Sequence, residues 1–150
     1  MTTTRIVRGH RNDYVVATPN KLCRYRADDF FGKEPETIEW INGFNEGAVF
    51  WDVGANVGLY SIYAARERNA HVWAIEPSVF NLECLARNIY LNDVSELVCI
   101  LPIALSDKTG ASLLRMSSTE WGGALSTFDK EYGFDGKNWQ RFSDFKPLVC

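Results

Sequence analysis

Three short apolar runs, separated by segments with the spacing of amphipathic helices, dominate the middle of this chain. The runs occupy residues 48–53, 71–75 and 97–105. A continuous apolar run of this length is typical of a strand that is buried on both faces of a sheet. The order strand, helix, strand, helix, strand describes two βαβ units, which require a parallel sheet with right-handed crossovers. The sequence therefore predicts an α/β fold whose sheet begins at residue 48.

The first 47 residues are predicted to form a separate unit, a hairpin followed by a helix. Residues 13–18 and 21–26 flank the dipeptide Pro19-Asn20, which is typical of a turn between two strands. Pro35 is tolerated at the first position of a helix, so the following residues are expected to be helical. We accordingly divide the chain into an N-terminal hairpin and helix extension, residues 1–47, and a sheet domain, residues 48–150.

Beyond the third apolar run the pattern changes to an antiparallel one. Residues 111–116 and 124–128 flank a turn-rich stretch and predict a second hairpin. No further βα unit can be recognised after it. The strand at 48–53 is then expected to keep an open edge, which favours a homo-oligomer or a place in a longer enzyme. The aromatic residues expected in the core are Trp40, Phe44, Phe50 and Trp51.

Composition excludes several classes of partner. The net charge is −3 and no basic stripe is present, so neither a nucleic acid nor an anionic membrane is expected to bind. No apolar run reaches the roughly 18 residues that a membrane span needs. With two histidines and no CxxC pair, no metal site is expected. The four cysteines are interpreted as reduced thiols of a cytoplasmic protein, and they are Cys23, Cys84, Cys99 and Cys150.

The segment that joins the first parallel strand to its helix has the residue types of a ligand-binding turn. It reads Asp-Val-Gly-Ala-Asn-Val-Gly, from Asp52 to Gly58. Ligands of open α/β sheets bind outside the carboxyl ends of the strands, where this turn is expected to lie. Gly54 lets the backbone approach a ligand closely, and Gly58 lets the helix begin close to the turn. The free N–H groups at that helix start can hold an anion.

The residues within this turn distinguish between nucleotide-like ligands. The dinucleotide pattern GxGxxG fails, because Asn56 and Leu59 stand where its second and third glycines would be. A carboxylate 4 Å from a pyrophosphate charge costs about 1 kcal/mol in water, and more when shielded from solvent. Asp52 instead suits S-adenosylmethionine (SAM), which carries an ammonium and a cationic sulfur. The alternative is that Asp52 only caps the turn.

A second acidic residue, Glu76, closes the second strand 22 residues after Gly54. An acid at this position can accept both hydroxyls of an adenosine ribose, by the same logic as in dinucleotide-binding folds. Ser78 follows at a position that either caps the next helix or faces the adenosine. Ala104 and Ser106 end the third apolar run, where an adenine edge would lie. Together with the turn, these residues predict an adenosine site.

The segments VFWDVGANVGLYS, AIEPS, LARNIYLND and PIALSDKTG together resemble the FkbM family of SAM-dependent methyltransferases. The resemblance implies a Rossmann-like class I methyltransferase fold and O-methylation of a hydroxyl on a sugar or natural product. It also implies that Glu76 takes the ribose diol and that Ser78, Ala104 and Ser106 lie near the adenine. The residues that it places at the methionine and ribose end are Asp52, Gly54, Ala55, Asn56 and Gly58.

The sequence departs from that family at one place and leaves other interpretations open. The Asp-x-Glu-Gly segment that follows in the family is absent, so the fold is expected to be incomplete at the C-terminus. A non-catalytic or truncated SAM-binding or interaction module is therefore an alternative. The glycine spacing argues against a nicotinamide-dependent dehydrogenase. No catalytic base can be named. Residues 121–123, Trp-Gly-Gly, are interpreted as turn filler, with an acceptor-site wall as the alternative.

Overall fold

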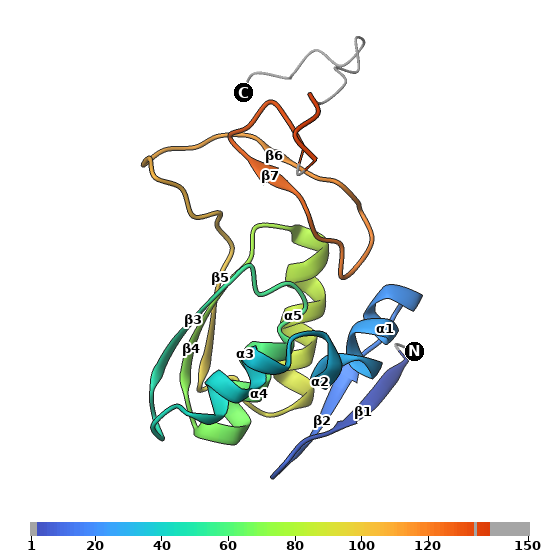
Figure 1. Cartoon of the computed structure of the whole chain (residues 1–150), viewed down its shortest axis with the longest axis vertical. Helices are drawn as coiled ribbons and strands as arrows, with labels where there is room; N and C mark the ends of the chain where they lie inside the picture. Colours follow the sequence, from blue (N-terminus) through green and yellow to red (C-terminus); the bar gives the residue numbers. More distant parts are fainter. Residues whose placement is uncertain (1–2, 134, 139–150) are drawn as a thin grey trace.

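The computed structural model describes residues 3–133 and 135–138 of the chain. The end of the predicted second domain, with Cys150, lies outside the described residues. The elements, shown in Figure 1, are β1 (Thr4–Arg8), β2 (Asp13–Ala17), α1 (Lys21–Asp28), α2 (Phe30–Lys33), α3 (Pro35–Asn42), β3 (Val49–Val53), α4 (Leu59–Arg68), β4 (His71–Ile75), α5 (Val79–Leu91), β5 (Val98–Leu101), β6 (Leu114–Arg115) and β7 (Thr127–Phe128).

The centre of the fold is a parallel sheet in the order β3-β4-β5, as the apolar runs predicted. Asp52 on β3 is level with Ala74 on β4, and Ala74 is level with Ile100 on β5. Both βαβ units are present, with α4 and α5 as the crossover helices. The strand β5 is shorter than the predicted run 97–105 and ends at Leu101. It ends there because Pro102 has no N–H group to donate to a neighbouring strand.

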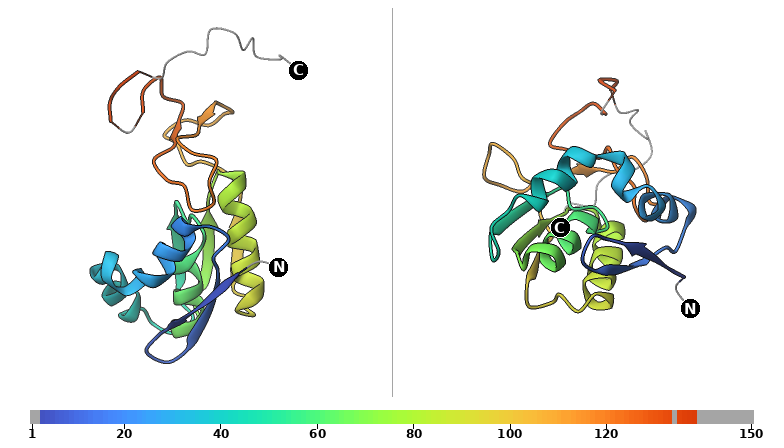
Figure 2. Two further views of the ribbon diagram at one scale, coloured as in Figure 1. Left: turned by 90° about the vertical axis from the view of Figure 1, so that its right-hand side faces the viewer. Right: turned by 60° about the horizontal axis from the view of Figure 1, so that its bottom comes forward.

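One face of this sheet is packed against helices. Phe50, Val72 and Val98 point to this face, are buried, and share one apolar core with Leu85 and Ile89 of α5. Ala64 and Ala65 of α4 also belong to this core, as expected for small residues where a helix approaches a sheet closely. Two further views show the helices on one side of the three strands (Figure 2).

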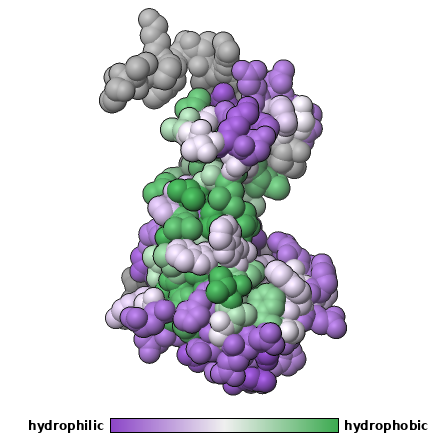
Figure 3. All heavy atoms as spheres, turned by 90° about the vertical axis from the view of Figure 1, so that its left-hand side faces the viewer, coloured by the Kyte–Doolittle hydropathy of each residue, from purple (hydrophilic) through white to green (hydrophobic). Residues whose placement is uncertain are grey.

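The opposite face of the sheet is bare among the described residues, which corrects the expectation that these strands are buried on both sides. Val49, Trp51 and Val53 alternate along β3 and are 65%, 61% and 58% exposed. Trp73 on β4 is level with Trp51 and is 39% exposed. Figure 3 shows the apolar side chains gathered on this side of the molecule. Trp51 is therefore not a core residue.

The N-terminal unit differs from the predicted hairpin. Residues 13–17 pair with β1 in antiparallel fashion, and residues 21–28 form the helix α1 instead of a second strand. Asn20 accounts for the difference, because its Oδ1 accepts the N–H of Cys23 at 2.8 Å and caps the helix. The predicted helix after Glu34-Pro35 is confirmed as α3, although Trp40 on it is 59% exposed and lies outside the core.

The N-terminal unit and the sheet share one apolar core, to which Tyr14, Phe30 and Phe50 all belong. The predicted second hairpin is confirmed in a shorter form, as β6 paired with β7. None of the helices in the described part of the chain combines the length and apolar character needed to cross a membrane. The carboxyl end of β3 faces α1 and α3 across one cavity. The carboxyl ends of β3 and β4 face β6 and β7 across another. The β6–β7 segment lies above the sheet in Figure 1.

Candidate functional site

The turn between β3 and α4 has backbone conformations that its residue types make accessible. Gly54 and Gly58 have φ of 78° and 82°, and Asn56 has φ of 53°. Glycine enters this left-handed region without steric penalty, and asparagine tolerates it better than most residues. The amides of Gly54 and Ala55 both donate to the carbonyl of Ile75, at 2.8 and 3.0 Å. The turn is thereby fastened to the carboxyl end of β4.

Asp52 is a buried carboxylate just before this turn, with 8% of its surface exposed. The hydroxyl of Ser61 on α4 donates to its Oδ2 at 2.5 Å. Burial raises the pKa of Asp52, the hydrogen bond from Ser61 opposes that shift, and the negative charge of Glu76 adds to it. No cationic side chain forms a salt bridge with Asp52 in the described part of the chain. A cationic ligand would therefore stabilise its charged form.

Glu76 follows β4 and is also buried, with 6% of its surface exposed. Its Oε2 accepts the N–H of Asn56 at 2.9 Å, and its Oε1 accepts the N–H of Ser78 at 2.8 Å. The side chain of Asn81 donates to the same Oε1 at 3.3 Å. The Glu76 carboxylate thus joins the glycine turn to the start of α5. Both carboxylates lie at the carboxyl ends of neighbouring strands.

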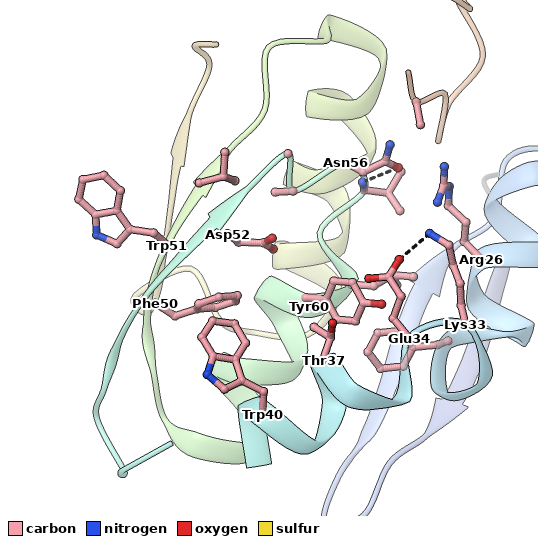
Figure 4. A pocket seen from close by; sticks show the side chains of 17 residues that line it. Arg26, Lys33, Glu34, Thr37, Trp40, Phe50, Trp51, Asp52, Asn56 and Tyr60 are labelled. Carbon is pink, nitrogen blue, oxygen red and sulfur yellow. Dashed lines mark hydrogen bonds and ion pairs between the residues drawn. The ribbon is translucent and has the colours of Figure 1, made fainter. Parts of the chain in front are cut away.

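A cavity of about 480 Å³ opens beside Asp52 and the turn. Gly54, Ala55 and Asn56 line it on the sheet side. Figure 4 shows the opposite wall, which the segment from α2 to α3 and the start of α4 supply. That wall carries polar and aromatic side chains, which are Lys33, Glu34, Thr37, Trp40 and Tyr60.

Two side chains of this wall, Glu34 and Tyr60, have pKa values shifted by their neighbours. Lys33 Nζ lies 3.0 Å from Glu34 Oε1 and lowers the pKa of that carboxyl. Burial raises the pKa of Tyr60, and the nearby Glu34 adds to the shift. At neutral pH the wall therefore offers an ionised carboxylate as acceptor and a protonated phenol as donor.

A second cavity, of about 470 Å³, lies beside Glu76. Ser78, Asn81 and Ala104 line it, together with residues 123–128. Gly54, Asn56 and Ala124 line both cavities, so the two spaces adjoin along the glycine turn. An extended ligand can lie across the turn, with one end beside each carboxylate.

The structure brings most of the predicted site residues together. Those that line one or both cavities are Asp52, Gly54, Ala55, Asn56, Glu76, Ser78 and Ala104. Gly58 lines neither cavity and instead lies against Leu85 of α5. Ser106 is exposed, bonds to the side chain of Asp107, and also lies outside both walls. Ser78 occupies the N-cap position of α5, but its side chain makes no capping hydrogen bond.

Three polar side chains at the site were missed by sequence reasoning. Asn81 contacts Glu76, and Ser61 contacts Asp52. Asn88 accepts the N–H of Ala17 at 2.7 Å and donates to the carbonyl of Val57 at 2.8 Å, so it ties β2 to the turn. Buried asparagines in a helix that otherwise carries an apolar stripe were the available signal.

Among the described residues no cluster of three potential metal ligands exists.

Comparison with known proteins places these features in context. Methyltransferase sdnD of Sordaria araneosa is 40% identical over 60 residues, which are 39% of this chain and 23% of that protein. The structure of P. horikoshii TYW2 in complex with MeSAdo aligns with a TM-score of 0.50 and 18% identity. That alignment covers 73% of this chain and 39% of the TYW2 chain. No family model matches the sequence.

The described residues form part of a Rossmann-like class I methyltransferase fold. The parallel sheet β3-β4-β5 with its two crossover helices is the part of this chain that has the Rossmann-like arrangement. This chain corresponds to well under two thirds of the length of either relative. Fold alone does not determine function, so the activity must be argued from the site.

Proposed function

We propose that this chain forms the SAM-binding part of a SAM-dependent methyltransferase. The observation that carries the proposal is the pair of buried carboxylates, Asp52 and Glu76, on either side of a glycine turn. The 40% identity to methyltransferase sdnD over 60 residues supports it. The TYW2 structure of the same fold was solved with MeSAdo, which supports an adenosine ligand for this site.

The residues present fit the chemistry of SAM. Asp52 is buried, and no cationic side chain of the described residues forms a salt bridge with it. A ligand with an ammonium and a sulfonium group would supply the missing positive charge. Glu76 sits at the end of the neighbouring strand, where its two oxygens can accept the two ribose hydroxyls. In this arrangement the residues around Asp52 would hold the methionine end of SAM, and those around Glu76 would hold its adenosine end.

When bound, SAM supplies an activated methyl group, which is the difficult part of the chemistry. The chain's own residues then have a positioning role. Asp52 would hold the cationic end, and Glu76 would fix the ribose. Glu34, Thr37 and Tyr60 stand across the cavity from Asp52, where an acceptor would approach. Glu34 can accept a hydrogen bond from an acceptor hydroxyl, and Tyr60 can donate one.

We infer that the chain is related to the FkbM family and that its acceptor is a hydroxyl of a sugar or natural product. The turn from Asp52 to Gly58 and the Glu76-Pro77-Ser78 segment support the family. The polar and aromatic wall formed by Thr37, Trp40 and Tyr60 suits a hydroxyl-bearing small molecule. A methyl-transfer assay against a panel of hydroxylated sugars and phenols tests the acceptor class.

The chain is expected to bind SAM or its demethylated product at least about tenfold more tightly than NAD. The reason is electrostatic, since a like-charge pair 4 Å apart costs about 1 kcal/mol in water and more in a shielded site. Asp52 therefore favours the cationic end of SAM and disfavours a pyrophosphate. Calorimetric titration of the chain with each ligand measures the difference. Tighter binding of NAD would contradict the proposed function.

A second candidate, a SAM-binding interaction module without turnover, is favoured by one observation. The bare face of the sheet presents Trp51 and Trp73 side by side on adjacent strands. In the described part of the chain β3 also pairs with β4 alone and leaves its other edge open. Measuring methyl transfer as well as SAM binding separates this candidate from an active enzyme.

A cytoplasmic location stays a prediction.

We propose that copies of the chain associate through the edge of β3 and the bare sheet face. An open strand edge beside exposed apolar residues is a ready template for pairing. The double substitution Trp51→Ser and Trp73→Ser is expected to shift the chain from oligomer towards monomer, as measured by light scattering. Tyr90→Ser is the matched control, since Tyr90 is 79% exposed on α5, away from this face. A wild-type chain that is monomeric at high concentration would contradict the proposal.

A further inference from the structure

Residues 121–123, which we call the strap, lie between β6 and β7 and reach down to α1 and α5 (Figure 1). Two side chains of the N-terminal unit bond to strap carbonyls. Asn20 Nδ2 donates to the carbonyl of Trp121 at 2.9 Å. Arg26 Nε and Nη2 donate to the carbonyl of Gly122 at 2.9 and 2.6 Å. The Arg26 guanidinium therefore donates two hydrogen bonds to one carbonyl oxygen.

Two side chains of the candidate site hold the strap from the other side. Asn56 Nδ2 donates to the carbonyl of Gly123 at 2.7 Å, and Asn81 Nδ2 donates to it at 2.9 Å. Asn81 Oδ1 also accepts the N–H of Gly122 at 2.9 Å. Asn81 is 2% exposed, so these bonds form away from solvent. Figure 4 shows Asn56 and Arg26 on the same side of the cavity.

The strap is closely fitted to this place. Gly122 has φ of 81°, and a Cβ atom there would lie 3.2 Å from Arg26 Nε and 3.3 Å from Cys23 Sγ. Gly123 lines the cavity beside Glu76, and Ala124, the next residue, lines both cavities. The strap therefore lies where the two cavities adjoin, next to the glycine turn.

Asn81 connects the strap to the proposed ribose-binding group. Its Nδ2 donates both to Gly123 and to Glu76 Oε1. If the strap moves, Asn81 moves with it and its hydrogen bond to Glu76 changes. If a ligand binds Glu76, the hydrogen bond that Asn81 can donate to the strap changes in turn. Groups that share a hydrogen-bonded network act together rather than independently.

We propose that Arg26 and Asn81 are positioning residues that hold the strap across the SAM site and so set the affinity for the cofactor. This inference rests on the proposed function and adds to it a role for the N-terminal unit. Arg26 and Asn81 each form two of the hydrogen bonds that hold the strap, and with both in place the strap is organised before the ligand binds, which lowers the cost of binding. Loss of either residue leaves the strap less ordered, so part of the cost of ordering it falls on each binding event.

The experiment measures the affinity for S-adenosylhomocysteine, the demethylated product, by calorimetry. Arg26→Ala and Asn81→Ala are each expected to weaken binding by about tenfold, the scale of one or two hydrogen bonds to a charged or buried group. The double variant is expected to bind about as weakly as the weaker single variant, because both changes loosen the same strap. Arg24→Ala is the matched control, since Arg24 is an exposed arginine on the same helix.

A second readout separates positioning from folding. Hydrogen exchange at the Gly122 amide is expected to slow by more than tenfold when S-adenosylhomocysteine binds the wild-type chain, and to respond far less in Arg26→Ala. Arg26 is only partly buried, so this variant is expected to fold even if Asn81→Ala does not. Wild-type affinity in Arg26→Ala, or independent effects of the two changes, would overturn the role of the strap alone. A wild-type chain that binds no S-adenosylhomocysteine would overturn the proposed function as well.

Discussion

Replacing Glu76 by alanine is expected to weaken SAM binding by about 1.5–3 kcal/mol, or about 10- to 150-fold. This is the scale of hydrogen bonds to a charged group, and the Glu76 carboxylate is the proposed acceptor for both ribose hydroxyls. Calorimetric titration with SAM measures the change. Glu83→Ala is the matched control, because it removes the same charge from an exposed position on α5 where the partner is Arg87.

The same substitution is also expected to lower the free energy of unfolding by about 1–3 kcal/mol. A carboxylate at the end of a strand would ordinarily contribute little to stability. Glu76, however, is buried and accepts the N–H groups of Asn56 and Ser78, which lose their acceptor in the variant. Denaturant titration of the ligand-free chain checks this loss. If stability falls while the folded variant binds SAM normally, Glu76 is a structural residue and its assigned role is wrong.

Replacing Gly58 by alanine is expected to lower the free energy of unfolding by about 2–5 kcal/mol. An alanine pays about 1–2 kcal/mol to hold the left-handed φ of 82°. Its Cβ would also lie 2.2 Å from Cδ1 of Leu85, and forcing a buried leucine to move costs about 1–3 kcal/mol more. Since Gly58 starts α4 at the end of the ligand turn, SAM affinity is expected to fall with stability.

Gly47→Ala is the control for this prediction. Gly47 has φ of 74°, but no atom lies within 4 Å of the position its Cβ would take. The Gly47→Ala variant is therefore expected to lose only the free energy that an alanine needs to hold a left-handed φ, about 1–2 kcal/mol. Denaturant titration gives the free energy of unfolding of both variants. The extra loss in Gly58→Ala measures the clash of its Cβ with Leu85. Equal losses would mean that the contact between α4 and α5 does not depend on this glycine.

Local sequence patterns were sufficient for the centre of the fold. The apolar runs that became β3, β4 and β5 are each bounded by a turn residue or a helix start, so each element was specified by its neighbours in the chain. The same holds for the turn, because Gly54 and Gly58 stand where the backbone has positive φ. Glu76 was recognisable because a strand-end acid lies near the carboxyl edge of any parallel sheet.

Local patterns failed where two structures competed for the same residues. Residues 21–26 carry a strand-like composition, yet a helix starts there because the N–H of Cys23 donates a capping hydrogen bond to Asn20 Oδ1. The true partner of β2 is β1, which the turn at Pro19-Asn20 gave no reason to choose. The exposure of Trp51 was likewise hidden, because an apolar run does not reveal whether one face or both faces of a strand are covered.

The sequence by itself determined the order β3, α4, β4, α5, β5 in the centre of the fold and the carboxylates at the strand ends. Only the tertiary structure brought together groups from distant parts of the chain. Arg26 bonds to Gly122 across 96 residues, and Asn81 bonds to the same residue across 41. The physical reason is that a hydrogen bond forms only when donor and acceptor are placed within a few tenths of an ångström and point towards each other. The packing of β2, α1 and α5 sets these positions and directions. A local pattern of residue types does not specify that packing.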